Sequence, residues 1–248
     1  MLTCVALIPA RSGSKRIPNK NIKKLGNYPL IAYTIAVAKL SKLFRDIIVS
    51  TDSEEIANVA KKFGASVPFL RPEEFATDTS PDIEWVLHAL IYFNKKNTLP
   101  EYFSILRPTS PFRTVEMLQK AMIRFATNRT ADSLRAVEHC NQHPAKMWTI
   151  KDGWMEPVMP GKSKKNEYWH STPHQDLPKV YAQNASLEIA WTKIPLQSNT
   201  IAGKRILPFL TQGFEGYDLN NEKDWVYAEY LLRSNKVHLP QIYLNDKN

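Results

Sequence analysis

The sequence predicts an α/β fold in which a mostly parallel sheet is flanked by helices. Short apolar runs that end at loop-forming residues alternate with amphipathic segments along most of the chain. This alternation is typical of successive β-α-β units, which form a parallel sheet with helices on its faces. The length of 248 residues is sufficient for one large core, so we treat residues 1–248 as a single domain.

The first β-α-β unit follows from the N-terminal segments. Residues 4–10, CVALIPA, form a short apolar run that ends at Pro and Ala, which predicts a buried strand followed by a loop. Residues 28–42 have the apolar spacing of a helix, and residues 45–52, RDIIVSTD, read as a second buried strand.

The next segments continue the alternation. We expect a helix over residues 53–64 that is closed by Gly64, followed by a brief strand at 66–70, SVPFL. Ser80 and Pro81 are predicted to begin the following helix as its N-cap and first residue, because these residue types favour those two positions.

The rest of the chain contains one interruption. The pattern breaks over residues 139–180, where Pro, Gly, His and Lys crowd a stretch with little periodicity, and we interpret this stretch as an insertion. The elements expected around it are helices at 81–93, 115–126 and 221–234, and strands at 102–108, 131–137, 185–191 and 204–210.

Composition limits the class of partner and the compartment. Lys and Arg total 33 against 24 Asp and Glu, so the formal net charge is +9, which favours anionic partners such as nucleotides, nucleic acid or acidic sugars. Only Cys4 and Cys140 occur, which gives no disulfide framework or zinc cluster and favours a reducing cytoplasm. The N-terminal apolar run lacks a basic leader and is too short to span a membrane, so we expect a soluble protein.

A basic loop follows the first predicted strand. The stretch LIPARSGSKRIPNKN, residues 7–21, and the residues through Lys24 hold several Lys and Arg and no acidic residue. In open parallel sheets ligands bind beyond the carboxyl ends of the strands, which is where this loop begins. Gly13 between Ser12 and Ser14 lets backbone N–H groups approach an oxyanion, while Arg and Lys bind phosphate. The alternative is a basic loop that is simply solvated, but its position at the strand end favours a triphosphate site. The loop matches neither the P-loop sequence nor the dinucleotide-binding fingerprint.

Several segments together resemble one enzyme family. They are IPARSGSKRIPNKN, IIVSTDSEEIA, FLRPEEFATDTSPD, LRPTSPFRT and HPAK, in this order, with QNASLEI and YDLNNEKDW further on. The set is similar to the acylneuraminate cytidylyltransferases, or CMP-sialic acid synthetases, and covers most of residues 4–146. The resemblance implies a Rossmann-like nucleotidyltransferase fold, with the insertion at 139–180 serving dimerisation and acceptor binding.

The resemblance also implies a reaction. The family transfers CMP from CTP to a free acidic nine-carbon sugar, such as sialic, legionaminic or pseudaminic acid, and releases pyrophosphate with the help of Mg²⁺. It implies a nucleotide-binding loop in this chain made by Ala10, Arg11, Ser12, Gly13, Lys15, Lys20 and Asn21, with Arg11 and Lys20 counted as catalytic.

Two further segments could belong to the nucleotide site. Arg71 and Ser80 match the family's cytosine-reading segment, whereas without the resemblance they would be an ordinary strand-end charge and an N-cap. Asp52 follows a buried strand and could be a metal ligand, but DSEE also fits an N-cap in which Glu55 reaches back, and we favour the cap.

The acceptor site departs from the family pattern. Arg107 stands where the family usually has Gln, and it could grip a carboxylate or form a structural ion pair; both interpretations stay open. Lys146, in HPAK, corresponds to a Lys that the family uses near the sugar. His143 in the same motif is expected to be structural and not catalytic. Asn184 matches the family, but Ala182 stands where an Arg is usual, which puts the identity of the sugar in doubt.

Asp218 is the predicted metal ligand and third catalytic residue. The family's motif has two Asp one residue apart, and here Asn220 takes the second place. Mg²⁺ often binds through one or two protein carboxylates, with phosphate oxygens and waters as its other ligands. Asp218 alone can therefore suffice, although Asp218 and Asn220 could also be turn residues before the last helix.

The insertion and the rival functions complete the prediction. Trp and His residues in the insertion could stack on a sugar or nucleic acid, but a homodimer contact is favoured, as in the family, because aromatic residues are enriched in interfaces. One rival is a nucleotidyltransferase that acts on a sugar 1-phosphate. The other is a basic nucleic-acid-binding module, which no recognisable motif supports, so we expect no nucleic acid and no membrane as partners.

Overall fold

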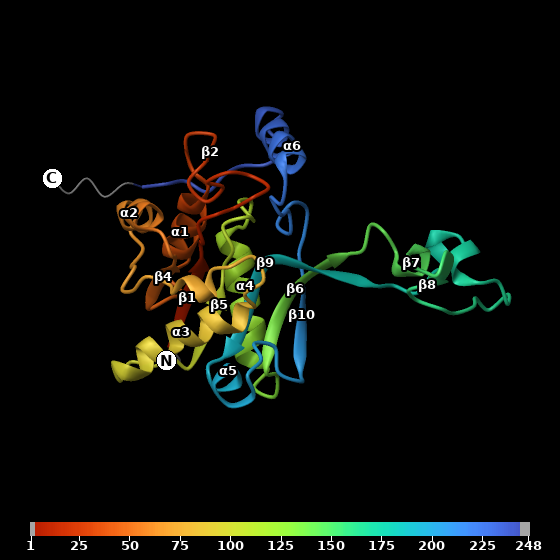
Figure 1. The fold of residues 1–248 in the computed structure, drawn as a ribbon, viewed down its shortest axis with the longest axis horizontal. Coiled ribbons are helices and arrows are strands. Elements are labelled where there is room, and N and C mark those ends of the chain that lie inside the picture. The colour runs from red at the N-terminus through yellow and green to blue at the C-terminus, as the bar shows by residue number, and fades with distance from the viewer. Residues whose placement is uncertain (1–2, 244–248) are drawn as a thin grey trace. The chain divides into compact units, whose positions relative to one another are not determined.

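The computed structural model describes residues 3–243 and divides the chain into two compact units (Figure 1). The core unit comprises the residues up to Ala136 together with those from Asn184 onward, and the insertion unit is Val137–Gln183. The insertion expected at 139–180 thus lies inside this second unit. None of the helices in the described range is long and apolar enough to cross a membrane.

A six-stranded sheet forms the centre of the fold. Its strand order is β10-β6-β9-β5-β1-β4. In it β1 pairs in parallel with both β4 and β5, whereas β9 runs antiparallel to β5. The predicted α/β fold with a mostly parallel sheet is confirmed. The strands are β1 (Cys4–Pro9), β4 (Asp46–Ser50), β5 (Tyr102–Ile105), β6 (Ser133–His139), β9 (Tyr181–Trp191) and β10 (Ile206–Leu210).

Helices cover both faces of the sheet because β1 is apolar on both sides. Cys4, Ala6 and Ile8 pack in the cluster that contains the buried residues of three helices, α1 (Leu30–Ser41), α2 (Glu54–Lys62) and α4 (Val115–Thr127). The alternate residues Val5 and Leu7 pack against α3 (Asp82–Lys95) on the opposite face. Alternation of side chains along a strand accounts for this division.

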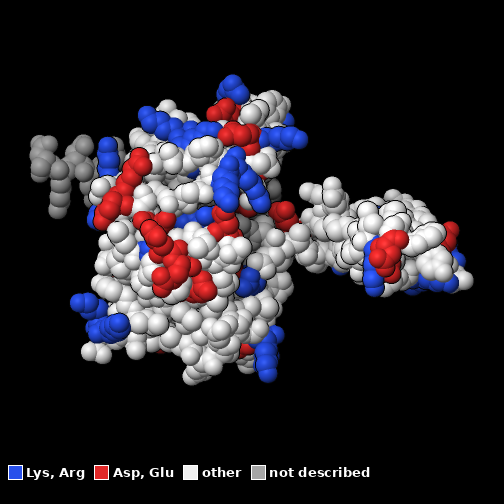
Figure 2. Space-filling view, in the orientation of Figure 1, with Lys and Arg blue, Asp and Glu red and all other residues white. Residues whose placement is uncertain are grey.

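A third apolar cluster fixes the basic loop. Ile17, in the middle of the loop, is fully buried with Leu219 and with Trp225 of α6 (Glu222–Arg233). The loop is therefore anchored at its centre by a hydrophobic contact, and the segment that carries Asp218 is held next to it. Basic side chains gather at the end of the core unit that carries β2 (Lys24–Leu25) and α6 (Figure 2).

Two local predictions are wrong. Residues 66–70 form no strand. Ser66 pairs with Ile48 of β4 in a single isolated β-bridge, and Pro68 has no N–H with which to extend the pairing. The helix expected to begin at Pro81 has Pro81 as its N-cap and begins at Asp82, so Ser80 is not the cap. In the insertion, for which the sequence predicted no particular element, β7 (Trp148–Lys151) and β8 (Trp154–Pro157) form a hairpin.

The hairpin had a signal in the sequence. Its two-residue connection is Asp152-Gly153, and both residues have positive φ angles, 50° and 82°. Asp-Gly between two strands is a typical type I′ hairpin turn. The remaining elements are β3 (Tyr28–Pro29), α5 (Lys193–Ser198) and four 3₁₀ turns, Glu73–Phe75, Pro144–Lys146, Trp169–Ser171 and His174–Asp176.

Candidate active site

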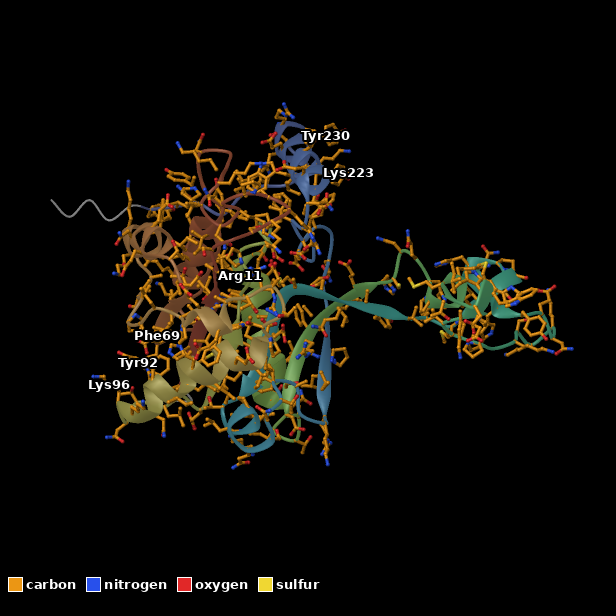
Figure 3. All side chains as sticks on the ribbon, in the orientation of Figure 1. Arg11, Phe69, Tyr92, Lys96, Lys223 and Tyr230 are labelled. Carbon is orange, nitrogen blue, oxygen red and sulfur yellow. The ribbon has the colours of Figure 1, made fainter. Side chains whose placement is uncertain are left out.

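The basic loop begins at the carboxyl end of β1. The Ala10 N–H donates to the carbonyl of Ser50 on β4, which keeps the first residue of the loop attached to the sheet. Arg11 follows directly, where the chain leaves the sheet (Figure 3). Gly13 has a φ of +66° and no atom within 4 Å of the position that a Cβ would take. A non-glycine residue there would be strained by its backbone alone.

A polar cavity of about 240 Å³ lies at this end of the sheet. Its walls come from the basic loop, from the segment between β4 and α3, and from the residues that follow β5. Six of the predicted site residues line it: Arg11, Lys20, Asn21, Arg71, Ser80 and Arg107. Nucleotide and acceptor candidates that are far apart in the sequence therefore share one cavity.

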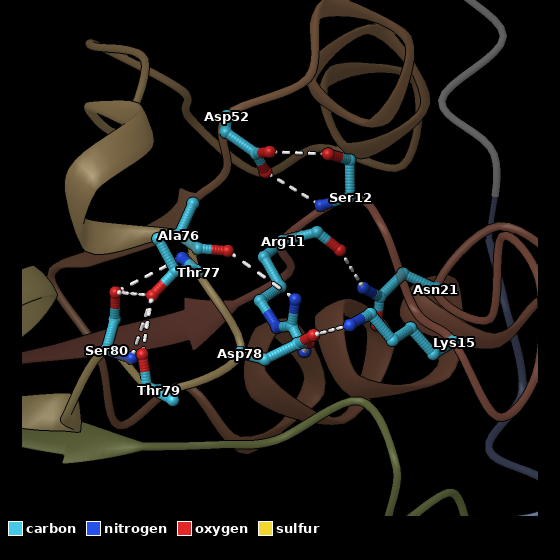
Figure 4. Close-up of polar contacts among 10 residues, drawn as sticks. All are labelled: Arg11, Ser12, Lys15, Asn21, Asp52, Ala76, Thr77, Asp78, Thr79 and Ser80. Atoms are coloured by element: carbon cyan, nitrogen blue, oxygen red, sulfur yellow. Dashed lines mark hydrogen bonds and ion pairs between the residues drawn. The ribbon is translucent and has the colours of Figure 1, made fainter.

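Asp78 holds the loop cations at this cavity (Figure 4). Its Oδ1 lies 2.5 Å from Arg11 Nη2, and its Oδ2 lies 2.6 Å from Lys15 Nζ. Hydrogen bonds from Lys15 and Arg11 lower the pKa of Asp78 below its ordinary value. Two of the cations predicted to meet phosphate, Arg11 and Lys15, are thus paired with a carboxylate in this structure.

Asp52 has a different role from the one expected. The N-cap of α2 is Ser53, whose Oγ accepts a hydrogen bond from the N–H of Ile56. Asp52 instead accepts hydrogen bonds from the N–H and the hydroxyl of Ser12 (Figure 4). The prediction of Asp52 as a cap is wrong by one residue, and its carboxylate fixes the loop at Ser12.

Lys20 and Asn21 hold the far side of the loop. Lys20 Nζ donates to the carbonyl of Leu219 over 3.0 Å, and Asn21 Nδ2 donates to the carbonyl of Arg11 over 3.0 Å. Burial lowers the pKa of Lys20, while the nearby carboxylate of Asp218 raises it. Lys20 is thus a partly desolvated cation on the cavity wall, and Asp218 is close enough to act on it.

Asp218 has one oxygen that fits a metal. Asn220 Nδ2 donates to Asp218 Oδ2 over 2.7 Å. Asp218 Oδ1 is buried and accepts no hydrogen bond from any residue of the described range. Among residues 3–243 no group of three or more His, Cys, Asp or Glu side chains could hold a metal ion. The arrangement fits a Mg²⁺ that binds one protein carboxylate and takes its other ligands from phosphate and water.

Arg71 and Ser80 form the opposite wall. Arg71 donates through Nε and Nη2 to the hydroxyl and carbonyl of Ser50, and its guanidinium lies 5.2 Å from the ring centre of Trp85. Burial lowers the pKa of Arg71 to about 10, so the side chain stays charged at neutral pH. Ser80 Oγ donates to the carbonyl of Glu74 and accepts from the N–H of Thr77, which closes the segment between them.

Arg107 lies between two carboxylates. Its Nη2 is 2.5 Å from Asp82 Oδ2 and 2.9 Å from Glu188 Oε1, so the structural ion pair that the sequence left open is present. Its Nη1 is buried and has no hydrogen-bond partner among the described residues. Arg113, six residues on, is buried, with its Nε donating to the carbonyl of Ser186.

The comparisons with known proteins agree with this arrangement. A family model described as cytidylyltransferase matches residues 5–147. A CMP-N,N'-diacetyllegionaminic acid synthase of Legionella pneumophila is 34% identical over 244 residues, which are 95% of this chain and 98% of that protein. The chain belongs to the cytidylyltransferase family.

Two further matches extend this result. An N-acylneuraminate cytidylyltransferase of Escherichia coli is 41% identical over 138 residues, which are 56% of this cytidylyltransferase and 32% of that protein. The structure of a CMP:2-keto-3-deoxy-manno-octonic acid synthetase complexed with CTP superposes with a TM-score of 0.67, covering 94% of this chain and 99% of that chain at 10% identity. The second match shows the fold alone and confirms the predicted nucleotidyltransferase fold.

The other two predicted acceptor residues of this cytidylyltransferase do not line the cavity. Lys146 belongs to the insertion unit, where its Nζ donates to the carbonyls of His170 and Thr172. Asn184 is buried, and its amide oxygen accepts hydrogen bonds from the N–H and hydroxyl of Ser186. Their contact with a sugar stays a prediction.

Sequence reasoning missed the acidic residues of the site. Asp78 and Asp82 both lie in the segment FLRPEEFATDTSPD, which was singled out for Arg71 and Ser80. Trp85 lines the cavity and donates from Nε1 to Asp82 Oδ1 over 2.7 Å. Charge could have indicated them, because a run of cationic side chains at the end of one strand favours acidic side chains at the end of a neighbouring strand.

Proposed function

We propose that this chain transfers CMP from CTP to a free acidic nine-carbon sugar and releases pyrophosphate. The observation that carries the proposal is that Arg11, Lys20, Arg71 and Arg107 line one cavity at the carboxyl end of β1. Four cationic side chains at one cavity suit a triphosphate and an acidic acceptor. The CMP-N,N'-diacetyllegionaminic acid synthase from Legionella pneumophila, matched over nearly its whole length, supports an acceptor of the legionaminic type. The family resemblance adds sialic and pseudaminic acids as candidates.

The reaction is a substitution at the α-phosphorus of CTP. The acceptor's hydroxyl oxygen forms a bond to that phosphorus and loses its proton, while the bond to the bridging oxygen breaks and pyrophosphate leaves. Such transfers depend on positioning and on neutralising charge. Arg11, Lys15 and Lys20 would neutralise the phosphates, and Arg71 would meet the cytosine ring. Arg107, on the cavity wall, would bind the acidic acceptor. Acceptor roles for Lys146 and Asn184 rest on the family resemblance alone.

Mg²⁺ is part of the proposal through one residue. Asp218 Oδ1 is a buried carboxylate oxygen that accepts no hydrogen bond within residues 3–243, and phosphate oxygens would supply further ligands. When bound, the ion would offset negative charge on the phosphates. Asn220 would keep the carboxylate in place through its hydrogen bond to Oδ2. We also keep the cytoplasm as the proposed location, from the low cysteine count.

A substrate screen tests the function directly. The purified protein is incubated with Mg²⁺ and each of CTP, UTP, GTP and ATP, paired with free sialic, legionaminic or pseudaminic acid or with sugar 1-phosphates. Pyrophosphate release is expected only with CTP and a free nonulosonic acid. Release with a sugar 1-phosphate in place of the free acid would favour the rival nucleotidyltransferase instead.

Asp78→Asn is expected to tighten CTP binding. The variant removes the carboxylate that occupies Arg11 and Lys15, so the phosphates no longer compete with it. Exposed ion pairs are weak because solvent screens them, so we expect a modest effect, roughly a two- to tenfold lower Kd in calorimetric titration with Mg·CTP. The matched control is Asp46→Asn, because Asp46 pairs with Arg45 outside the cavity. Weaker CTP binding by Asp78→Asn would show that the carboxylate helps the nucleotide to bind.

The insertion unit is expected to form a homodimer. Its apolar side chains are unusually accessible, with Ile150 78% and Trp154 79% exposed. Such side chains typically lie at interfaces. Sedimentation should give a dimer at micromolar concentration, and Ile150→Ser combined with Trp154→Ser should give a monomer. Ile123→Ser on α4 of the core unit, where Ile123 is 65% exposed, is the control. A wild-type monomer would refute the dimer.

A further inference from the structure

Glu188 is a buried carboxylate shared by two arginines. Its side chain is 4% exposed, and its Oε1 lies 2.9 Å from Arg107 Nη2. Its other oxygen, Oε2, lies 2.9 Å from Arg135 Nη1. Arg135 is on β6, Glu188 on β9, and Arg107 follows β5 by two residues; these three strands are neighbours in the sheet. Each oxygen of Glu188 is therefore assigned to one guanidinium.

Stability alone does not explain this arrangement. Glu188 stands on β9 between Leu187 and Ile189, and it faces Ile105 of β5 in the register of the two strands. Removing a carboxylate and its partner from water is costly, and an apolar residue at such a position is often at least as stabilising. A buried charge on a central strand therefore calls for a role besides packing.

The orientation of Arg107 supplies that role. Nη2 of Arg107 meets both Asp82 and Glu188, while Nη1 is buried and has no partner in the described part of the chain. Arg107 is also a wall residue of the cavity. Both carboxylates meet the same nitrogen, Nη2, and fix that end of the planar guanidinium, which leaves Nη1 as the donor that a ligand in the cavity would meet. A guanidinium that is fixed in this way loses little entropy on binding a carboxylate.

The two carboxylates differ in what else they touch. Asp82 also accepts a hydrogen bond from Trp85, whose ring lies against Arg71. A change at Asp82 would therefore disturb the nucleotide side as well. Within the described residues, the side chain of Glu188 forms ion pairs with Arg107 and Arg135 alone, so its removal acts on these two arginines and does not reach Arg71.

We propose that Glu188 is a positioning residue for the acceptor: it holds the Arg107 guanidinium in the orientation that receives the carboxylate of the acidic sugar. This inference rests on the proposed function, since it requires an acidic acceptor in this cavity. Arg135 in turn balances the second oxygen of Glu188. Glu188 itself acts through Arg107 and does not contact the substrates.

Kinetics of Glu188→Gln test the inference. The variant keeps the side chain's shape but loses the charge that holds Arg107. We expect the KM for the nonulosonic acid to rise roughly tenfold, with kcat and the KM for CTP changed by less than about twofold. Arg135→Gln is the matched control, because it removes a buried ion pair of the same carboxylate and leaves the Glu188–Arg107 pair in place. Its acceptor KM is expected to stay within about twofold of the wild type.

A double variant separates positioning from general damage. If Glu188 acts through Arg107, Glu188→Gln adds no further rise in acceptor KM once Arg107 is already Gln. A further rise in that background would overturn the inference, as would equal acceptor KM values for Glu188→Gln and Arg135→Gln, or a parallel rise in the KM for CTP.

Three outcomes need separate treatment. If Glu188→Gln does not fold, Glu188→Gln combined with Arg135→Gln removes one charge of each sign, and the same rise in acceptor KM is expected from it. If the wild-type protein uses no free nonulosonic acid, the proposed function fails, and the inference fails with it. If the wild type is active but Glu188→Gln leaves the acceptor KM as low as Arg135→Gln does, the proposed function stands and only the positioning role of Glu188 is refuted.

Discussion

Arg11→Ala and Lys20→Ala are each expected to lower kcat by about 100-fold or more. Both side chains line the cavity at the carboxyl end of β1, where the triphosphate is proposed to lie. Removing one preorganised charge contact to a developing anion commonly costs about 10²–10³ in kcat. Lys20 is half-buried, and this burial lowers its pKa. A cation that is partly removed from water interacts more strongly with phosphate than a fully solvated one.

The measurement is pyrophosphate release at saturating CTP and acceptor. Lys24→Ala is the matched control, because Lys24 is an exposed cation at the end of the same basic segment and does not line the cavity. Its kcat is expected to match that of the wild type. Thermal unfolding of each variant checks that the loop, which is anchored by buried Ile17, keeps its place. Near-normal turnover in folded Arg11→Ala and Lys20→Ala would refute the phosphate role of these residues.

The place of the nucleotide loop could be predicted because it depends on local sequence. An apolar strand followed directly by Gly, Ser and cations fixes both the strand and the end at which the loop emerges. The errors were also local. The N-cap of α2 is Ser53 and not Asp52. The sequence could not distinguish them because Ser and Asp both favour the N-cap position, and the backbone conformation decides between two neighbouring residues. The segment 66–70 has the apolar content of a strand, but Pro68 cannot donate to a ladder.

The partners of the cations could not be predicted, because they come from distant parts of the chain. Arg11 and Asp78 are 67 residues apart, and nothing in the local sequence around Arg11 indicates that Asp78 is its partner. The ion pairs of Arg107 depend on β9 lying beside β5, an antiparallel neighbour in a mostly parallel sheet. Strand order is a property of the whole fold, so the sequence left the ion pair and the ligand contact of Arg107 equally open.

Arg107→Gln is expected to raise the KM for the acidic acceptor tenfold to a hundredfold while leaving the KM for CTP nearly unchanged. Gln is the residue that the resembled sialic acid enzymes usually have here, so the variant restores an amide where this chain has a guanidinium. The substitution removes a charged donor group whose Nη1 has no hydrogen-bond partner within residues 3–243. Loss of a hydrogen bond to a charged group costs about 1.5–3 kcal/mol, which gives an effect of that size.

The structure makes this prediction sharper, because Arg107 is also an ion-pair partner of Asp82 and Glu188. A purely structural role would loosen the wall that Asp82 shares with Trp85 and would raise both KM values together. A role in binding the acceptor would raise the KM for the acceptor alone. Arg45→Gln is the control, since Arg45 forms an ion pair with Asp46 away from the cavity and should leave both KM values unchanged. An equal rise in both KM values for Arg107→Gln would show that the guanidinium supports the fold of the site, and the carboxylate of the sugar would then need another partner.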